Sequence, residues 1–377
     1  MEIIANIKKM GNNTPDKPEE PGLPADFIKP AIMQAEDNYD VFRAGMDYRK
    51  ALKRLEKSSG LVVEGSYSTA LAFYSWLKKK ITTAHPVNDY SSSRTARQIV
   101  SEKTGKILVR VKDHVPDLEK APNIPWLRTF YPDNNNFLIS LPDLLGMNGA
   151  WQWFDKGVSY PVLPHKLHPW YGVYFPSRTS HLAVFDKWLN LNGEKFPKGT
   201  DIGTGCGILS FMMAGHGIEK IYATDINPNA VYSTRMETGR LNISNRINIE
   251  QASFFGTLRD VSGLVVLNPP WIPGKPSGIT DAGIYYQESF FNRFFSEAEK
   301  KLLPGTTLAI IFSNFAIEAG IIDHNPVERA LRETRNFITE EKITADVREK
   351  IPRKSKNWLN RIREKEKTEL WILRRTG

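Results

Sequence analysis

Residues 201–207 read Asp201-Ile202-Gly203-Thr204-Gly205-Cys206-Gly207, and the apolar stretch ILSFMMAG that follows them predicts a helix. Glycines let a backbone turn tightly and approach a ligand where a Cβ atom would clash. The N-terminus of the helix adds unpaired N–H groups. The spacing is G-x-G-x-G, whereas the dinucleotide-binding fingerprint G-x-G-x-x-G would need a glycine at Ile208. Taken alone, such a turn is either a ligand-binding loop or a purely structural one.

An acidic residue, Asp225, closes the next apolar stretch, KIYATD. An acid at the tip of the second strand can accept hydrogen bonds from the ribose hydroxyls of an adenosine. The alternative is a cap for the helix expected after Asn227-Pro228, and the two roles do not exclude each other. Because the glycine turn lies upstream, we favour contact with a ribose.

The same region alternates short apolar strands with helical patterns, which is typical of a doubly wound α/β sheet. It is entered through the proline-punctuated stretch 161–170, PVLPHKLHPW. We therefore expect an α/β, Rossmann-like domain over residues 161–377. Its strands are expected at 221–224, 247–250, 264–267, 307–312 and 370–373.

The first 160 residues predict two further parts. Five prolines beside acidic residues, between Pro15 and Pro30, indicate a flexible tail over residues 1–34, with an extended arm on the folded body as the alternative. Residues 35–160 predict a smaller N-terminal accessory domain that could present the substrate. From about Ala35 to Ile81 the pattern is helical: Tyr48, Leu52 and Leu55 recur at helical steps before a stop at residues 58–60, and a second helix is expected over residues 68–81. A loop is expected at 83–104, and short strands at 107–111 and 136–139.

A second motif follows the apolar run 264–267 directly: Asn268-Pro269-Pro270-Trp271. In an open α/β sheet the carboxyl ends of strands line the ligand crevice. Two prolines make the turn stiff and leave carbonyl groups without competing N–H donors. The Asn268 side-chain oxygen and the Pro269 carbonyl could accept both protons of an amide or exocyclic amine and aim its nitrogen at a methyl group. Trp271 is expected to offer a flat face to a planar acceptor, although a plain turn with a core tryptophan is the alternative.

With these residues in place, the chain resembles the class I S-adenosylmethionine-dependent methyltransferases, of the methyltransferase small domain type. Their acid before a G-x-G-x-G turn, and the acid that closes the next strand, match Asp201–Gly207 and Asp225. The resemblance implies S-adenosyl-L-methionine as cofactor, with the glycines near its methionine part and Ser253 and Phe254 near its adenine. The cofactor contacts that it implies are Asp201, Gly203, Thr204, Gly205, Gly207, Asp225, Ile226, Ser253, Phe254, Asn268, Arg178 and Thr179.

The Asn-Pro-Pro-aromatic motif is similar to that of amino-methyltransferases that modify adenine N6, guanine N2 or protein glutamine amides. The resemblance implies Asn268, Pro269, Pro270 and Trp271 as the catalytic corner, acting without a metal. The stretch from Tyr174 to Ser180 is similar to a proline–arginine segment of release-factor glutamine methyltransferases, which implies that Arg178 and Thr179 help to close the site; a surface arginine with a helix-capping threonine is the alternative. In the loop that follows the motif, Asp281, Tyr285 and Tyr286 are candidate acceptor contacts.

Composition bounds the partners. The 377 residues are 41% hydrophobic and 25% charged, as in ordinary globular proteins, and no apolar run has membrane-spanning length. The N-terminus lacks a secretory signal pattern, and the single Cys206 excludes an intrachain disulfide and a multi-cysteine zinc site. We therefore expect a cytoplasmic enzyme with no membrane and no metal partner.

The formal charge of +9 would favour an anionic partner such as RNA. A basic stretch around Trp358 could contact phosphate, but a solvated face is the more frequent reading of such a run. RNA and a protein glutamine remain the two candidate acceptors. A nicotinamide-dependent oxidoreductase on a similar sheet and a non-catalytic cofactor-binding scaffold are the rival functions. The basic side chains concerned are Arg353, Lys354, Lys356, Arg361 and Arg363.

Overall fold

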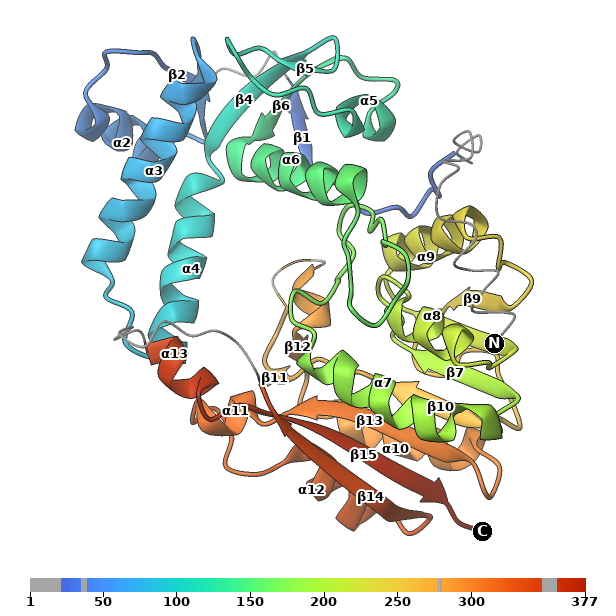
Figure 1. The fold of residues 1–377 in the computed structure, drawn as a ribbon. Helices are drawn as coiled ribbons and strands as arrows, with labels where there is room; N and C mark the ends of the chain where they lie inside the picture. The colour runs from blue at the N-terminus through green and yellow to red at the C-terminus, as the bar shows by residue number, and fades with distance from the viewer. Residues whose placement is uncertain (1–21, 35–38, 277, 279, 348–357) are drawn as a thin grey trace. The chain divides into compact units, whose positions relative to one another are not determined.

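The computed structural model describes residues 22–34, 39–276, 278, 280–347 and 358–377 of the chain (Figure 1). The chain divides into two compact units: unit 1 comprises residues 1–28 and 156–377, and unit 2 comprises residues 29–155. Within the described residues, no helix is both long and apolar enough to cross a membrane.

Unit 1 is built on a seven-stranded sheet in the order β14-β15-β13-β10-β7-β8-β9. The strands β13, β10, β7, β8 and β9, the last of which is an edge strand, run parallel, and β15 pairs antiparallel with both β13 and β14. This mixed α/β sheet confirms the predicted Rossmann-like class, and all five predicted strands are present. The strands are β7 Lys198–Ile202, β8 Lys220–Asp225, β9 Ile247–Gln251, β10 Leu264–Leu267, β13 Thr307–Ser313, β14 Phe337–Asp346 and β15 Lys367–Arg375.

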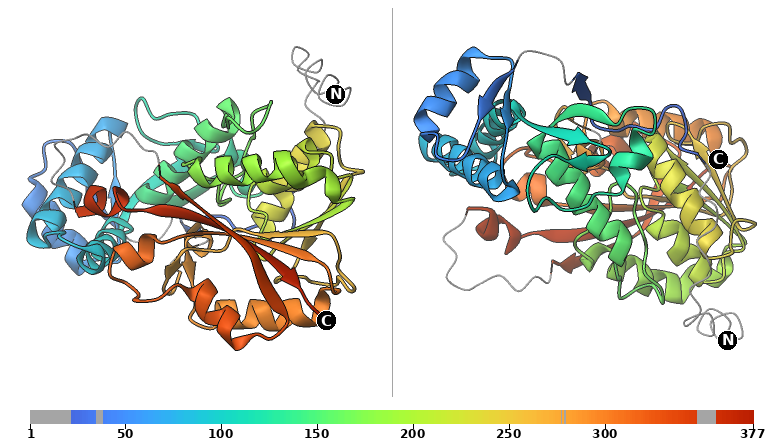
Figure 2. Two further views of the ribbon diagram at one scale, coloured as in Figure 1. Left: turned by 60° about the horizontal axis from the view of Figure 1, so that its bottom comes forward. Right: turned by 90° about the horizontal axis from the view of Figure 1, so that it is seen from above.

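Helices cover both faces of this sheet (Figure 2). On one face, α10 and α12 pack on alternate side chains of β10 and β13, Val265, Leu267, Leu308, Ile310 and Phe312, in one apolar cluster. The intervening side chains of the same strands point to the other face, where α7 lies. The helices of unit 1 are α7 Ser180–Asn192, α8 Ile208–Gly215, α9 Pro228–Arg240, α10 Phe290–Lys301, α11 Phe315–Glu318, α12 Pro326–Glu333 and α13 Trp358–Arg363.

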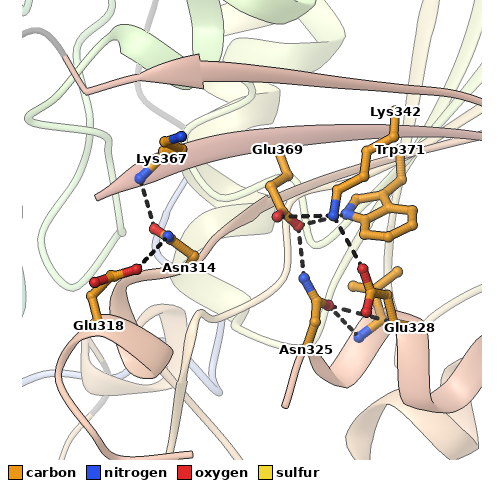
Figure 3. Close-up of polar contacts among 9 residues, drawn as sticks. Asn314, Glu318, Asn325, Glu328, Lys342, Lys367, Glu369 and Trp371 are labelled. Carbon is orange, nitrogen blue, oxygen red and sulfur yellow. Dashed lines mark hydrogen bonds and ion pairs between the residues drawn. The ribbon is translucent and has the colours of Figure 1, made fainter. Parts of the chain in front are cut away.

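The antiparallel edge of the sheet is fixed to α12 by buried polar contacts (Figure 3). The Glu369 carboxylate accepts hydrogen bonds from Asn325 Nδ2 at 2.7 Å and from Trp371 Nε1 at 2.9 Å, and pairs with Lys342 Nζ at 3.0 Å. Asn325 also caps α12, because its Oδ1 accepts from the Val327 N–H at 2.9 Å. These contacts give the Glu369 carboxylate two hydrogen-bond donors and one cation as partners, which offsets the cost of burying its charge.

Unit 2 contains a second sheet in the order β1-β6-β4-β3-β2, with β5 paired to β4. Its strands are β1 Ile32–Gln34, β2 Asp40–Phe42, β3 Leu61–Val63, β4 Ile107–Lys112, β5 Val115–Pro116 and β6 Asn136–Ser140. The strands predicted at 107–111 and 136–139 are confirmed as β4 and β6. Its helices are α2 Tyr48–Lys57, α3 Tyr67–Ala84, α4 Tyr90–Thr104, α5 Trp126–Phe130 and α6 Leu141–Lys156, the last reaching the boundary with unit 1.

The loop expected at residues 83–104 is wrong, because most of it forms α4. The helix begins with a capping box, in which the Asp89 side chain accepts from the Ser92 N–H at 2.8 Å and Ser92 Oγ accepts from the Asp89 N–H at 3.1 Å. Few of its side chains are fully buried, Ala96 and Thr104 among them. Because so few of its residues are buried, the sequence of α4 is mostly polar and lacks the apolar periodicity of a helix. The capping box at Asp89 and Ser92 is the sequence feature that indicates its start.

The flexible tail expected over residues 1–34 is wrong for its described part, residues 22–34; residues 1–21 lie outside the described residues. Phe27 is buried in unit 1 with its ring edge-to-face against Trp170 and Tyr232. The Ile28 backbone N–H and C=O bond to the Asn229 side chain, both at 2.8 Å. Residues 32–34 form β1 of unit 2. The extended-arm alternative describes this segment, since one buried ring and one paired amide offset its loss of chain entropy.

Replacing Phe27 with alanine should release this arm from unit 1. Removal of a buried phenylalanine costs about 3 kcal/mol, so exchange of the Ile28 amide hydrogen should accelerate by roughly 100-fold. Hydrogen exchange measured at residue 28 tests this, with the exposed Asp26→Ala as the control. Equal exchange rates in Phe27→Ala and the control would show that the arm is held by something else.

Candidate functional site

The glycine turn between β7 and α8 is organised around Asp201. This side chain is fully buried, and its Oδ2 accepts hydrogen bonds from Thr204 Oγ1 at 2.7 Å, from Ser210 Oγ at 2.7 Å and from the Ser210 N–H at 3.0 Å. One carboxylate oxygen thus ties the end of β7 to the turn and to the first turn of α8. Asp201 does not line the pocket described below. Its predicted cofactor contact is therefore corrected to support of the turn.

Burial raises the pKa of Asp201 to about 6, although the hydroxyl and N–H donors of Ser210 and Thr204 favour the charged form. Among the described residues, no group donates a hydrogen bond to its other oxygen, Oδ1. The three donors on Oδ2 do not fully replace the lost hydration, so the neutral acid is favoured relative to an exposed aspartate.

Asp225, at the end of β8, holds the middle of the same turn. Its Oδ2 accepts from the Gly205 N–H at 2.8 Å, and its Oδ1 accepts from the Asn227 N–H at 2.9 Å. The carboxylate also lines the pocket, and burial raises its pKa while these N–H donors lower it. The cap near α9 that was the alternative role is made by Asn227, whose Oδ1 accepts from the Asn229 N–H. Asp225 is thus placed both to shape the turn and to face a ligand.

The glycines are required by backbone geometry. All three have positive φ angles, +72° at Gly203, +55° at Gly205 and +82° at Gly207. A Cβ atom on Gly207 would come within 2.6 Å of the Phe211 ring and 2.8 Å of Thr234, so this glycine lets α8 approach α9. Gly207 is the N-cap of α8 and does not line the pocket, whereas Gly203 and Gly205 do.

These residues form one wall of a pocket of about 330 Å³ in unit 1, which lies within the range of small-molecule sites. The carboxyl ends of β7, β8 and β10 and the start of the loop after β9 supply the walls. The predicted site residues that line it are Gly203, Thr204, Gly205, Asp225, Ile226, Ser253, Phe254, Asn268, Pro269, Pro270, Tyr285 and Tyr286.

Two apolar side chains border the pocket beside Asp225. Ile226 is 69% exposed and presents apolar surface at the pocket. Phe254 comes from the loop after β9 with φ +48°, and the Arg293 guanidinium of α10 lies 5.7 Å from its ring centre. Arg293 also lines the pocket. Its position in the site could not be predicted from the sequence, because an arginine is common on the polar face of an amphipathic helix.

The Asn268 corner lies across the pocket from this wall, with Trp271 directed away from it. The indole Nε1 donates to Asn268 Oδ1 at 3.1 Å, and the ring packs edge-to-face on His181 of α7 at 5.2 Å. Trp271 packs against the apolar core and does not line the pocket, so the flat acceptor face expected from it is wrong. A part-buried indole N–H needs an acceptor, and the Asn268 oxygen is within reach.

The segment before α7 closes another side of the pocket, but not with the residues predicted. Tyr174 and Pro176 line the pocket; Arg178 and Thr179 do not. Arg178 Nη1 pairs with the buried Glu366 carboxylate at 2.9 Å, and Glu366 also accepts from Ser313 Oγ at 2.8 Å. Thr179 is the N-cap of α7 without a side-chain cap bond. Neither is therefore supported as a cofactor contact: Arg178 fixes this segment to Glu366, and Thr179 holds the N-cap position of α7.

The loop after the Asn268 corner contacts that segment. It contains β11 Ile272–Pro273, the 3₁₀ helix η2 Thr280–Gly283 and β12 Tyr285–Tyr286. A Cβ atom on Gly283 would lie 2.8 Å from the Tyr174 ring, which shows how closely the two stretches pack. Tyr285 and Tyr286 line the pocket, but Asp281 does not, so the acceptor contact expected from Asp281 is not supported.

The predicted basic stretch around Trp358 is described only in part. Arg353, Lys354 and Lys356 lie outside the described residues. The remaining members, Trp358, Arg361 and Arg363, belong to the short helix α13. None of these three lines the pocket.

Comparison with known proteins now bears on this site. Residues 187–343, from α7 to β14, match the family model described as methyltransferase small domain. No curated protein matches the chain. The family match gives no support to the nicotinamide-dependent oxidoreductase considered from the sequence.

Solved structures give distant likenesses only. A Pyrococcus horikoshii protein provisionally assigned as an RNA methyltransferase has a TM-score of 0.38 and 12% identity, and the match covers 61% of this chain and 99% of that one. The ribosomal protein L11 methylase of Lactobacillus delbrueckii subsp. bulgaricus has a TM-score of 0.33 and 15% identity, covering 51% and 80%. The tRNA m1G37 methyltransferase of Methanocaldococcus jannaschii has a TM-score of 0.33 and 17% identity, covering 55% and 52%. Likenesses of this degree carry no argument about the acceptor.

The raised pKa of Asp201 predicts a pH dependence of stability. The folded pKa of about 6 lies above the 3.8 of an unperturbed aspartate, so between pH 3.8 and 6 the folded protein binds this proton more tightly than the unfolded chain does. The Asp201 contribution to the unfolding free energy should therefore be largest below pH 4, fall as the pH rises to about 6, and then stay constant, by on the order of 3 kcal/mol in total. The difference in unfolding free energy between wild type and Asp201→Asn, measured with urea from pH 4 to 7, isolates this group; a difference independent of pH would contradict the prediction.

Proposed function

Because residues 187–343 belong to the methyltransferase small domain family and the chain is an S-adenosylmethionine-dependent methyltransferase, we propose that it methylates a planar nitrogen, on an RNA base or on a protein glutamine amide. The observation that carries the proposal is the position of Asn268-Pro269-Pro270, which lines the same pocket as the glycine turn. A nitrogen held at that corner would face a cofactor bound on the turn.

The pocket residues fit S-adenosylmethionine. A Cβ atom on Gly203, which lines the pocket, would meet no protein atom within 4 Å, so the backbone of the turn is open to a ligand at this residue. Asp225 presents a carboxylate suited to ribose hydroxyls. Exposed Ile226 and Phe254 offer apolar contact to an adenine, and Ser253 a hydroxyl. When bound, the cofactor supplies an electrophilic methyl carbon attached to a sulfonium.

The acceptor nitrogen needs help because its lone pair is delocalised into a ring or carbonyl. In our proposal, Asn268 Oδ1 and the Pro269 carbonyl accept the two N–H protons, which directs the remaining lobe of the nitrogen toward the methyl carbon. As the nitrogen–carbon bond forms and the carbon–sulfur bond breaks, positive charge grows on the nitrogen. These two oxygen dipoles stabilise that charge without reorganising.

The proton that the nitrogen loses goes to solvent in this mechanism. Of the described lining residues, Asp225 and Arg293 are the charged ones, and Asp225 is engaged by the turn. Burial raises the pKa of Tyr286 to about 12, so its phenol stays protonated at neutral pH. A nitrogen that becomes cationic on methylation is acidic enough to lose its proton to water, so no strong base is required.

Trp271 is, in our proposal, a positioning residue for Asn268. Its N–H occupies one lone pair of Oδ1 and so fixes which end of the amide faces the acceptor. His181 supports the ring on its other side, and burial lowers the pKa of His181 to about 4, so the imidazole stays neutral. The second lone pair of Oδ1 is then the one that binds the acceptor.

Asn268→Ala should lower methyl transfer by roughly 10²–10³-fold while leaving affinity for S-adenosylmethionine nearly unchanged, since the lost contact is on the acceptor side. Transfer of a tritiated methyl group into cell extract measures this, and ribonuclease and protease digestion of the product identify the acceptor class. The control is Asn248→Ala, an exposed asparagine of β9. Full activity of Asn268→Ala would refute the assignment.

Trp271→Phe, which keeps an aromatic ring but removes the N–H, should lower kcat about tenfold with little change in KM.

Asp225→Ala should weaken binding of S-adenosylmethionine by roughly 1–3 kcal/mol, the scale of a lost charged hydrogen-bond partner. Isothermal titration calorimetry of the purified protein measures this without any acceptor. Asp225→Asn, which keeps one oxygen for the Gly205 N–H, should bind with intermediate affinity. Binding as tight as wild type in Asp225→Ala would exclude this carboxylate from the cofactor site.

A further inference from the structure

The first helix of unit 2 carries an unusual charge pattern. α2 has the sequence YRKALKRLEK, in which five of ten residues are cationic and one is acidic. Its apolar positions Ala51 and Leu55 are buried, so the cations occupy the outward face. α3 packs beside α2 and adds three consecutive lysines without any acid in the helix. We name the α2–α3 basic surface after its exposed members, Arg49, Lys50, Lys53, Arg54, Lys57, Lys78, Lys79 and Lys80.

The nearby acids are engaged elsewhere. Glu56 pairs with Lys103 of α4 at 3.1 Å, and Glu64 pairs with Arg43 at 2.7 Å. Asp47 caps α2, with its Oδ1 accepting from the N–H groups of Arg49 and Lys50, both at 3.0 Å. Among the described residues, the structure gives no ion pair to any side chain of the α2–α3 basic surface. Its charge is therefore largely uncompensated.

This arrangement costs α2 stability. Arg49 and Lys50 stand in the first turn, where the helix dipole disfavours cations. Like charges also face each other at i,i+4 spacing in the pairs Arg49–Lys53 and Lys53–Lys57. An ordinary solvated helix face mixes acids with bases and avoids both costs. The pattern is accounted for if an anionic partner neutralises it.

Two aromatic rings lie between α2 and α3, which are neighbouring helices in Figure 1. The half-buried Trp76 of α3 packs on Tyr48, the first residue of α2, at 5.4 Å between ring centres. Lys80, one turn further along α3, holds its ammonium group 5.8 Å from the Trp76 ring centre. A partly exposed indole with one cation beside it, on a surface rich in cations, matches the way proteins bind single-stranded nucleic acid, by phosphate contacts and base stacking.

From these observations we propose that the α2–α3 basic surface binds the phosphate backbone of RNA. The inference rests on the proposed function and deepens it, since it favours RNA over protein glutamine as the acceptor. An anionic membrane fits less well, because an interfacial helix must insert its apolar face, and the apolar face of α2 is already packed inside unit 2.

Binding of the full-length protein to a fluorescein-labelled single-stranded RNA and to an RNA hairpin, followed by fluorescence anisotropy from 50 to 300 mM KCl, tests this surface. The triple variant K50Q/K53Q/K57Q should bind at least about tenfold more weakly at 100 mM salt, and its log–log salt slope should be shallower by roughly 2–3. K50R/K53R/K57R, which keeps the charges, should bind as wild type does. K187Q/K198Q/K220Q, which removes three charges from exposed lysines of unit 1, should bind nearly as tightly as wild type.

Several outcomes would overturn the proposal: no RNA binding by wild type, equal weakening in the unit 1 control, or tighter binding of polyglutamate or phosphatidylserine vesicles than of RNA. Circular dichroism and thermal unfolding of the whole protein verify that each variant is folded in both units. The assay needs no methyl transfer, so its result is separate from that of the proposed function. RNA binding through α2 without N-methylated RNA would count against RNA as the methyl acceptor, whereas N-methylated RNA without a contribution from α2 would count against this surface.

Discussion

A single buried carboxylate sets the geometry on which the site of unit 1 depends. Asp201 gathers three donors from Thr204 and Ser210 on one oxygen, deep at the end of β7. The backbone of the turn is held from the other side by β8, where the Thr224 carbonyl accepts from the N–H groups of Gly203 and Thr204 at 2.8 and 2.9 Å. Burial of an acid in this way is costly unless donors surround it. The turn therefore has one shape before any ligand arrives.

The parallel ladder transmits that shape to the rest of the pocket. The register pairs Ile202 with Thr224 and with Leu267, so Gly203, Asp225 and Asn268 each follow a paired residue at the same edge of the sheet. Since strand spacing is fixed by backbone hydrogen bonds, the distance between the turn and the Asn268 corner is a property of the sheet. The glycine turn ends 61 residues before Asn268, but β7 and β10, which lead into the two motifs, are directly paired strands. In the proposed reaction, this pairing brings the cofactor and the acceptor into the same pocket.

The parts predicted correctly from sequence are those with a strong local signal. Apolar runs such as 264–267 and the glycine turn gave the strands, the sheet class and the pocket wall, because burial and backbone strain act at those residues directly. The directions of side chains could not be predicted in the same way. Arg178 turns toward Glu366, a residue 188 positions away, and Trp271 turns toward His181. In both cases a distant partner decides, and no pattern in the neighbouring residues reveals it. The helix α4 was missed for a different reason, since its sequence is polar and its cap is the clearest marker.

The inward position of Trp271 has a consequence for the acceptor. In a corner of this type, a planar acceptor needs a flat surface to lie on, and Trp271 does not provide one toward the pocket. The aromatic rings that do line it beyond the corner are Tyr285, Tyr286 and Phe290, and Tyr286 is braced edge-to-face by Phe291 at 5.2 Å. These rings are brought to the pocket by β12 and by the start of α10, next to the segment of Tyr174. In the proposed reaction, one part of the site therefore orients the acceptor nitrogen, and another part supports the planar group that carries it. In this proposal Asn268 and Trp271 set the hydrogen bonds to the nitrogen, and the loop after the corner sets which planar group can enter the pocket.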